Sequence, residues 1–486
     1  MEATIAMNTS QGQSSETTVA SGVGELAVWV AAVLNLLAAG GFEMILRGQD
    51  PRVPYDSQLN PELLVQYSIA LISISFTLLY LRGSGGRGLM LFFIGILPFV
   101  SILWSPDYYN AFRFYLVFAA SAFTAIGSAV YFTPRALLQV VTRAALLSVL
   151  GSVVVIVVFP IFGIHNATDI IQSVHAGDLR GIFDHKNQFG LEMGIALLLF
   201  TIVPKIWILS GVVRYLLIFL AILLLALSRS ASAAVFTGAT LLIVWITIYR
   251  FTSSAIITTL LRLLLILALM IAILWIVVVA SDGSGVESAL EQFLGRDLTL
   301  TGRVPVWEYI LSMVNNPLWF GLGYHTGFDV NIAPILSQIF GPVFSDPHNG
   351  YIDTYVSLGV VGLSFFLFIT FWALFNACRL LSCKNYDLKM LAQCAFGLVI
   401  FYLLASLTES VLSIGAKPIF VNCFTFVAAM IVNGRRIRRG STSQTRTVTG
   451  LPLRNKARSL NQGHADRNLK PGAWRIIGSE SKGARP

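Results

Sequence analysis

Long apolar segments separated by short polar stretches recur along this chain from residue 26 to residue 433. The hydrocarbon core of a bilayer is about 30 Å thick, so a helix needs roughly 20 apolar residues to cross it. About 12 segments of the chain approach this length. Only 12% of the residues are charged, against about 25% in soluble domains. The sequence therefore predicts an all-α polytopic membrane protein and excludes a soluble globular class.

The predicted membrane helices are 26–46, 64–81, 88–104, 114–132, 137–162, 188–203, 211–227, 232–249, 257–280, 351–377, 390–408 and 418–433. Cytoplasmic loops of membrane proteins are enriched in Lys and Arg. With the N-terminus placed inside, every predicted cytoplasmic loop carries at least one of these residues. We therefore expect both termini in the cytoplasm and one large periplasmic loop at 281–350.

The two ends of the chain differ from the apolar part between them. Residues 1–25 have no basic region followed by an apolar core, so we expect a disordered cytoplasmic arm rather than a cleaved signal peptide. Residues 434–486 begin with "GRRIRRG" and are rich in Arg, Ser and Gly. This composition predicts a disordered basic tail that binds anionic membrane lipid. Because the basic residues concentrate there, the net charge of +9 does not indicate nucleic acid binding.

The large outer loop contains its own structural signals. The stretch "TGRVPVWEYILSMVNNP" predicts a helix with Thr301 as its N-cap and Pro317 at its end. The aromatic residues of "PLWFGLGYHTGF" are typical of packing at a membrane surface. The four cysteines lie in late helices or on the predicted inner side, so they indicate neither an outer disulfide nor a metal site.

Several basic residues lie on the predicted outer side, against the bias that places the others inside. They are Arg180, Lys186, Arg229, Arg296 and Arg303. A single outer cation has ordinary explanations, but several at the mouths of membrane helices predict an anionic partner.

Each charged residue at these mouths also has a structural interpretation. Arg229 in "LSRSAS" suits a tight turn between two helices. Asp184 and Lys186 suit a helix cap followed by an interface anchor. That interpretation is weaker for Arg303, because a cation in the first turn of a helix opposes the helix dipole.

Two further ionisable residues are functional candidates with structural alternatives. His348 in "DPHNGY" is either an ordinary loop histidine or a proton acceptor at the end of the large loop. Glu192 lies about one turn inside the predicted helix 188–203, where an ionisable group is a functional candidate. The alternative is that Glu192 pairs with a neighbouring helix.

The order of five short motifs gives the chain a family resemblance. They are "RGIFDHKNQFG", "LSRSAS", "LTGRVPVW", "GLGYHTGF" and "DPHNGYIDTYVSLGVVG". Together, over roughly residues 180–365, they resemble the O-antigen ligase and Wzy-type polymerase superfamily of bacterial surface polysaccharide synthesis. The "FDHKN" form is most similar to the exopolysaccharide polymerase branch typified by succinoglycan production.

The resemblance implies a substrate, a scaffold and a site. The substrate is an oligosaccharide on undecaprenyl diphosphate at the outer leaflet of the bacterial inner membrane. The implied reaction is a metal-independent, inverting glycosyl transfer without a cofactor, on a GT-C-like helical scaffold. Arg229 and Arg303 match the diphosphate-binding arginines of the family, and His348 matches its motif histidine, the general base. Arg180 and Lys186 are further phosphate candidates.

The chemistry of the residues agrees with this resemblance. A departing diphosphate needs its charge stabilised, and guanidinium groups bind phosphate oxygens bidentately. An attacking hydroxyl loses a proton, which suits a histidine that titrates near neutrality. Asp184 and Glu192 are secondary candidates for the base, and Asn349 for holding the turn around it.

Three functions remain open at this stage. The leading hypothesis is a polymerase that joins lipid-linked repeat units into a growing polysaccharide, with a chain-length regulator and export proteins as possible partners. The second is a ligase that transfers glycan to lipid A core. The third is a lipid-linked oligosaccharide flippase or other transporter, which would place its charges near the bilayer midplane. Here the charges gather on one outer face, which favours the enzymes.

Overall fold

The computed structural model describes residues 24–47, 61–81, 86–169, 175–203, 211–248, 303–314, 318–340, 346–412 and 418–434, together with helical positions 257, 260, 261 and 264. Most of the predicted helix 257–280 and of the loop 281–302, with Arg296 and Thr301, lies outside the described residues, as do Pro317 and the tail after residue 434. Within the described residues the fold is helical, and its one β-feature is an isolated antiparallel bridge between Ile164 and Leu179.

The first helix of the described residues is Gly24–Ala38. It continues with α2 (Glu43–Arg47), α3 (Pro61–Leu81), α4 (Gly86–Ser101), η1 (Ile102–Trp104), α5 (Tyr108–Tyr131), α6 (Pro134–Val158), α7 (Pro160–Gly163), α8 (Lys186–Ile202), α9 (Gly211–Leu227) and α10 (Ala231–Ile248). After the large loop begins, the helices are α13 (Arg303–Met313), α14 (Thr326–Asn331), α15 (Ala333–Phe340), α16 (Gly350–Leu380), α17 (Tyr386–Ala405) and α18 (Pro418–Asn433).

The predicted apolar segments coincide with these helices, with corrections at their ends. The segment 26–46 is interrupted by a turn before α2, and 137–162 divides into α6 and α7 where Pro160 starts a new helix. The segment 114–132 begins earlier, because Asp107 caps α5 by accepting a hydrogen bond from the backbone N–H of Asn110. By length and composition, four described helices can each cross a membrane: α5, α6, α16 and α17. The full set of about 12 spans stays a prediction.

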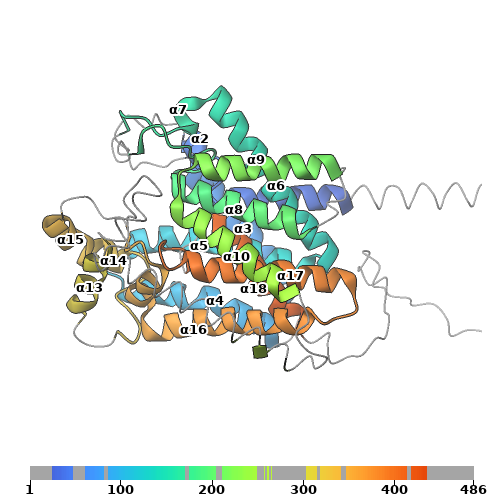
Figure 1. The fold of residues 1–486 in the computed structure, drawn as a ribbon. Helices are drawn as coiled ribbons and strands as arrows, with labels where there is room; N and C mark the ends of the chain where they lie inside the picture. Colours follow the sequence, from blue (N-terminus) through green and yellow to red (C-terminus); the bar gives the residue numbers. More distant parts are fainter. Residues whose placement is uncertain are drawn as a thin grey trace, which may run out of the picture. The chain divides into compact units, whose positions relative to one another are not determined.

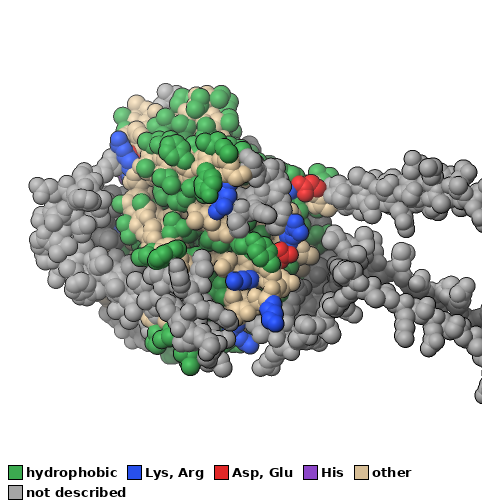
Figure 2. Space-filling model, turned by 45° about the vertical axis from the view of Figure 1, so that its right-hand side comes forward, with side chains coloured by type: hydrophobic (Ala, Val, Ile, Leu, Met, Phe, Trp, Pro, Cys, Tyr) green, Lys and Arg blue, Asp and Glu red, His purple; other side chains and the backbone are tan. Residues whose placement is uncertain are grey.

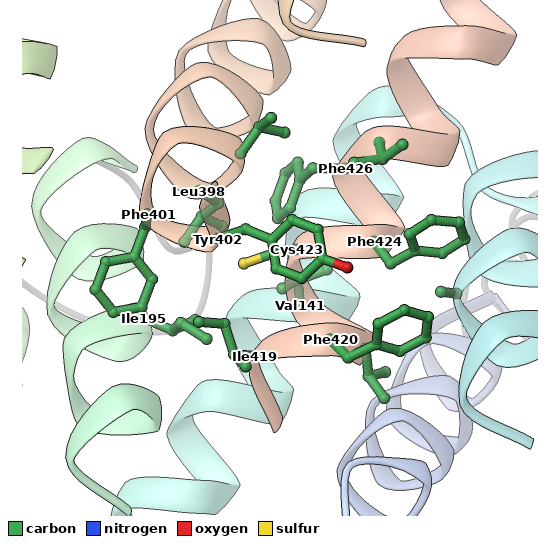
Figure 3. Close-up of a cluster of buried hydrophobic side chains, with 14 of the residues drawn as sticks. Val141, Ile195, Leu398, Phe401, Tyr402, Ile419, Phe420, Cys423, Phe424 and Phe426 are labelled. Carbon is green, nitrogen blue, oxygen red and sulfur yellow. The ribbon is translucent and has the colours of Figure 1, made fainter. Parts of the chain in front are cut away.

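The core lies where α17 and α18 pack against α6 and α8. In α17, 89% of the membrane-length window is buried, against 44% in α16, so α17 is a central helix and α16 a peripheral one. Figure 3 shows the apolar cluster at this junction, with Tyr402 of α17 pointing toward Phe420 and Phe424 of α18 and Phe401 of α17 lying beside Ile195 of α8. The rings of Phe420 and Phe424 stack with their centroids 5.0 Å apart.

Large apolar side chains also cover much of the outside. On α9 they include Val212, Tyr215, Leu216, Phe219, Ile222 and Leu223, all exposed. Figure 2 shows apolar side chains spread over much of the described surface in that view. An apolar exterior of this extent is unfavourable in water and favourable against lipid. The protein is therefore a helical membrane protein.

Helix α16 contains a break that the apolar pattern did not predict. Gly359 has φ 71° and ψ −169°, which is outside helical geometry. At this break Val360 N–H donates to the Leu318 carbonyl at 2.7 Å, and Leu322 N–H donates to the Val356 carbonyl at 2.7 Å. The segment 318–323 thus packs its backbone against the opened helix. A Cβ on Gly359 would lie 2.4 Å from the Trp319 backbone, so this contact requires glycine.

The loops predicted to lie outside come together at one end of the helices. Arg229 Nη1 lies 3.2 Å from Oδ1 of Asp178, and Arg303 Nη1 lies 3.9 Å from Oε1 of Glu409, so two pairs of these loops are in contact. In Figure 1, α13, α14 and α15 lie at the end of the molecule where α8 and α16 begin. This convergence agrees with the predicted alternation of the loops, while the side of the membrane that they face remains a prediction.

Candidate functional site

The turn after α17 is contacted by two of the predicted site residues, Arg303 and Asn349. Asn349 caps α16, and its side-chain amide donates to the Leu407 carbonyl at 3.3 Å. The next residue, Gly350, donates its backbone N–H to the Ser406 carbonyl at 2.8 Å. The start of α16 is therefore fixed on this turn, so Asn349 holds the backbone next to His348.

Arg303 is joined to the same turn from α13. Its Nη1 donates to the Thr408 carbonyl and lies 3.9 Å from Oε1 of Glu409. The same carboxylate oxygen accepts a hydrogen bond from the Asn187 side chain at 2.9 Å. Glu409 therefore connects the large loop to the first turn of α8.

On the other side of that turn of α8, two cations share one buried carboxylate. Lys186 Nζ lies 2.8 Å from Oδ2 of Asp178, and Arg229 Nη1 lies 3.2 Å from Oδ1. Asp178 is 1% exposed, whereas the Arg229 side chain is 55% exposed. Arg229 also adopts φ 52°, an uncommon backbone conformation for a residue other than glycine. The Arg229 side chain is therefore anchored at one end and accessible to a ligand.

Arg180 is buried rather than presented on the surface. Its Nη1 is 3.1 Å from the Asp169 carboxylate, and its other nitrogens donate to the carbonyls of Phe162 and Ile161, each at 2.9 Å. These contacts satisfy the charge within the protein. Arg180 thus fixes the segment that leads to the bridge between Ile164 and Leu179, directly beside Asp178.

Three histidine rings lie close together beneath this segment. The centroids of His165, His175 and His185 are 5.1 to 5.7 Å apart. Burial, followed by the positive charge of Arg180, lowers the pKa of His165 to about 3, so this ring is neutral. Asp184 is half-buried, and its charge acts on both His165 and Arg180. His185 caps α8 by accepting from the Asn187 backbone N–H at 3.1 Å.

His348 lies in the turn before α16. Its backbone has φ 50°, and its N–H donates to Oδ1 of Asp346 at 2.8 Å. The ring nitrogen Nδ1 lies 3.3 Å from the same oxygen. Trp307 of α13 donates its indole N–H to the Pro347 carbonyl at 2.8 Å, which holds the turn from the other side. The imidazole thus lies beside the Asp346 carboxylate without a hydrogen bond from Nδ1 among the described residues, and its side chain remains partly accessible.

Glu192 is separate from this group. It is buried on α8, and Asn422 of α18 donates its side-chain amide to Oε2 at 3.0 Å. This contact matches the structural alternative, in which Glu192 pairs with a neighbouring helix. No described hydrogen bond or ion pair links it to His348 or to the arginines.

The sequence analysis did not identify the two carboxylates that organise the site. Asp178 and Glu409 lie in loops predicted to be on the outer side, in "HAGDLR" and "LTES". A usable signal was present, because outer cations at membrane mouths require counter-ions and few acidic residues lie in the same loops. That signal gives candidate counter-ions, but it does not show which carboxylate pairs with which cation. Those pairs depend on how the helices pack.

Comparison with known proteins supports the resemblance given by the motifs. Residues 215–367 match the family model described as O-antigen ligase. The matched part begins within α9, contains α10, Arg229, Arg303 and His348, and ends within α16. The match indicates a function of the O-antigen ligase or polymerase type, and lipid-linked glycans as the class of substrate. No curated protein matches the chain.

Proposed function

We propose that this protein is a glycosyltransferase that polymerises oligosaccharide repeat units carried on undecaprenyl diphosphate, at the periplasmic face of a bacterial inner membrane. One observation carries the proposal. Three cations from separate parts of the chain, Lys186, Arg229 and Arg303, lie along one set of contacts that runs through Asp178 and Glu409.

The donor diphosphate binds at the exposed arginine in this proposal. Arg229 contacts one oxygen of the Asp178 carboxylate, and Lys186 contacts the other, so the two cations share one negative charge. A diphosphate brings several negative charges, and an arginine fork binds phosphate oxygens bidentately. The diphosphate therefore competes well for Arg229, while Lys186 stays with Asp178 and preserves the local geometry.

Arg303 stabilises the leaving group from the opposite side. Its described contacts use Nη1, at Thr408 and near Glu409, whereas a guanidinium carries five N–H donors. The remaining donors are available to phosphate oxygens. Fixed donors that face the position where charge develops are among the largest contributors to catalysis. In this arrangement, arginines supply the positive charge that a divalent cation supplies in other phosphate sites.

The reaction uses His348 as the base. The acceptor hydroxyl oxygen forms a bond to the anomeric carbon of the donor sugar on the face opposite the diphosphate, and the configuration inverts. The bond from that carbon to the phosphate oxygen breaks, and its electron pair leaves with undecaprenyl diphosphate. The hydroxyl proton moves to the imidazole of His348, whose Nδ1 faces Asp346.

Arg180 supports the site rather than contacting substrate in this proposal. Its side chain is 2% exposed, and its charge is already paired with Asp169. It fixes the loop that presents Asp178 to Lys186 and Arg229. Asp184 adds a favourable charge next to Arg180.

A reconstituted reaction tests the proposal. Purified protein is incubated with a lipid-linked repeat unit, and the product length is read on a gel. We expect a ladder of glycans from the wild-type protein and none from Arg229→Ala at equal expression. If the folded wild-type protein leaves the lipid-linked unit unchanged, both with the repeat unit of its own source and with other repeat units, the proposal is wrong.

The description of the matching family favours a ligase as the second candidate. A ligase transfers glycan once to a lipid A core acceptor, so adding this acceptor would give one product of fixed size instead of a ladder. Vesicles that contain the protein distinguish the transporter alternative, because a flippase moves the lipid-linked unit across the bilayer without forming a glycosidic bond.

A further inference from the structure

His325 has no role in the proposed reaction, but it shares an uncommon positive φ with two residues that have one, Arg229 and His348. Within the described residues, positive φ occurs at four positions that are not glycine: Phe42, Arg229, His325 and His348. Such conformations are uncommon and tend to occur at functional sites. Arg229 and His348 already have roles in the proposed reaction, so His325 is the ionisable residue of this group that needs an explanation.

The side chain of His325 is held on two sides. Its ring stacks on Phe114 of α5, with centroids 3.8 Å apart and planes 9° from parallel. Its Nδ1 lies 3.1 Å from Oδ2 of Asp329, one turn further along α14. The two side chains are 17% and 35% exposed. Among the described residues, Nε2 of His325 has no hydrogen-bond partner, so it is available to a ligand.

The backbone that carries His325 is fixed by close contacts on its other face. Gly323 has φ 106°, and a Cβ at this position would lie 2.6 Å from Cα of Ser105. The Tyr324 N–H donates to Ser101, and the hydroxyls of Thr326 and Ser105 are hydrogen-bonded. The imidazole is therefore presented from a rigid segment between η1 and α14, as a preorganised binding group requires.

Charge distinguishes this part of the site from the diphosphate side. Burial alone would lower the pKa of His325, but the hydrogen bond and charge of Asp329, with the charges of Asp353 and Asp346, raise it above the ordinary value. Three carboxylates thus act on His325. A diphosphate would be repelled by this acidic group, whereas carboxylates readily accept hydrogen bonds from neutral hydroxyls.

One carboxylate, that of Asp346, acts on His325 and contacts the proposed base. His325 and His348 therefore share the influence of one carboxylate. In the proposal that follows, a group bound at His325 presents its hydroxyl to His348.

We propose that His325 and Asp329 bind the sugar hydroxyls of the acceptor glycan, with Phe114 holding the imidazole in place. This assignment rests on the proposed transferase function and adds the acceptor position to it. His325 contributes Nε2 and Asp329 its carboxylate, and neither takes part in breaking the bond to the diphosphate.

Separate variation of donor and acceptor tests the assignment. The donor is the lipid-linked repeat unit, and the acceptor is a water-soluble glycan with the same repeat unit and no lipid. The variants are His325→Asn, in which Asn tolerates positive φ, and Asp329→Asn. The matched control is Glu308→Gln, an exposed carboxylate on α13. Loss of a hydrogen bond to a charged group corresponds to roughly tenfold in affinity.

We expect both variants to raise the KM for the acceptor about tenfold or more, with the KM for the donor within about twofold of wild type, and the control to change neither. An unchanged acceptor KM in both variants, or an equal rise in both KM values, would overturn the assignment. Binding of the soluble glycan, followed by NMR without donor, gives a second measurement. If the wild-type protein binds this glycan through Asp329 but forms no glycosidic bond, the transferase proposal fails while the sugar site stands.

Discussion

Replacing Asp178 with asparagine should destabilise the protein by about 3–5 kcal/mol, because it removes the counter-ion of a buried lysine. Asp178 is 1% exposed, and Lys186 is buried beside it. Asparagine has a similar shape and keeps one oxygen acceptor, so the substitution changes mainly the charge. The cation of Lys186 then lies in a poorly solvated site without its negative partner.

The magnitude follows from the two contacts of this carboxylate. Lys186 Nζ is 2.8 Å from Oδ2 of Asp178, which corresponds to about 6 kcal/mol of direct attraction at an effective dielectric constant near 20. Desolvation of both groups offsets part of that attraction, and breaking a buried pair typically costs about 3–5 kcal/mol. The pair with Arg229 adds less than about 1 kcal/mol, because that side chain is largely in solvent.

A double-mutant cycle with Lys186→Met measures the interaction. The free energy of unfolding is determined in detergent for wild type, Asp178→Asn, Lys186→Met and the double variant. Methionine retains most of the apolar length of lysine and removes the charge, so the double variant should be more stable than Asp178→Asn alone. We expect a coupling free energy of at least about 2 kcal/mol. Glu308→Gln serves as the exposed carboxylate control and should stay within about 0.5 kcal/mol of wild type.

Two results would refute this reasoning. A coupling free energy below about 0.5 kcal/mol would show that Lys186 and Asp178 behave as an exposed pair. An Asp178→Asn variant as stable as wild type would show that another group satisfies the lysine. Either result would also remove the physical basis for sharing one carboxylate between Lys186 and the donor-binding arginine.

Three further predictions address the base, the helix break and the topology. His348→Ala should reduce the transfer rate by about 10²- to 10⁴-fold and leave binding of undecaprenyl diphosphate nearly intact, whereas Arg303→Ala should weaken both rate and binding; equal losses of binding would contradict this division of roles. Gly359→Ala should strongly reduce the free energy of unfolding, because the added Cβ would lie 2.4 Å from neighbouring backbone. The control is Gly238→Ala within α10, where the added Cβ meets open space; this variant should be neutral or add up to about 1 kcal/mol to the free energy of unfolding. An impermeant thiol reagent added outside intact cells should label Tyr108→Cys and leave the native cysteines unlabelled; labelling only after the membrane is opened would reverse the predicted orientation.

Local sequence patterns were sufficient to predict most helices and their type. Long apolar segments require helices in a bilayer, because each backbone N–H and C=O must be satisfied within the segment. The ends were harder to predict. The cap at Asp107 starts α5 earlier than the apolar pattern does, and Pro160 divides a segment that the pattern joins. Capping and proline effects act over a few residues and do not change the average hydropathy.

The motifs also identified residues that the structure brings together. Arg303 and His348 lie around the turn after α17, and Arg229 contacts Asp178, which also binds Lys186 in the first turn of α8. Their roles in catalysis remain proposals. The same reasoning placed Arg180 with the phosphate candidates, because an outer charge in a sequence does not show whether a carboxylate already satisfies it.

The sequence by itself determined that this chain is a helical membrane protein, and it marked the cations and the histidine that form the candidate site. Only the tertiary structure decided which carboxylate serves which cation. Asn187 and Glu409 are 222 residues apart, yet their side chains meet at 2.9 Å. Hydrophobic periodicity shows which face of a helix is buried, but not which loop of a distant helix lies beside it. Those pairings depend on how the helices pack, because an ion pair acts over a few ångströms in space regardless of separation along the chain.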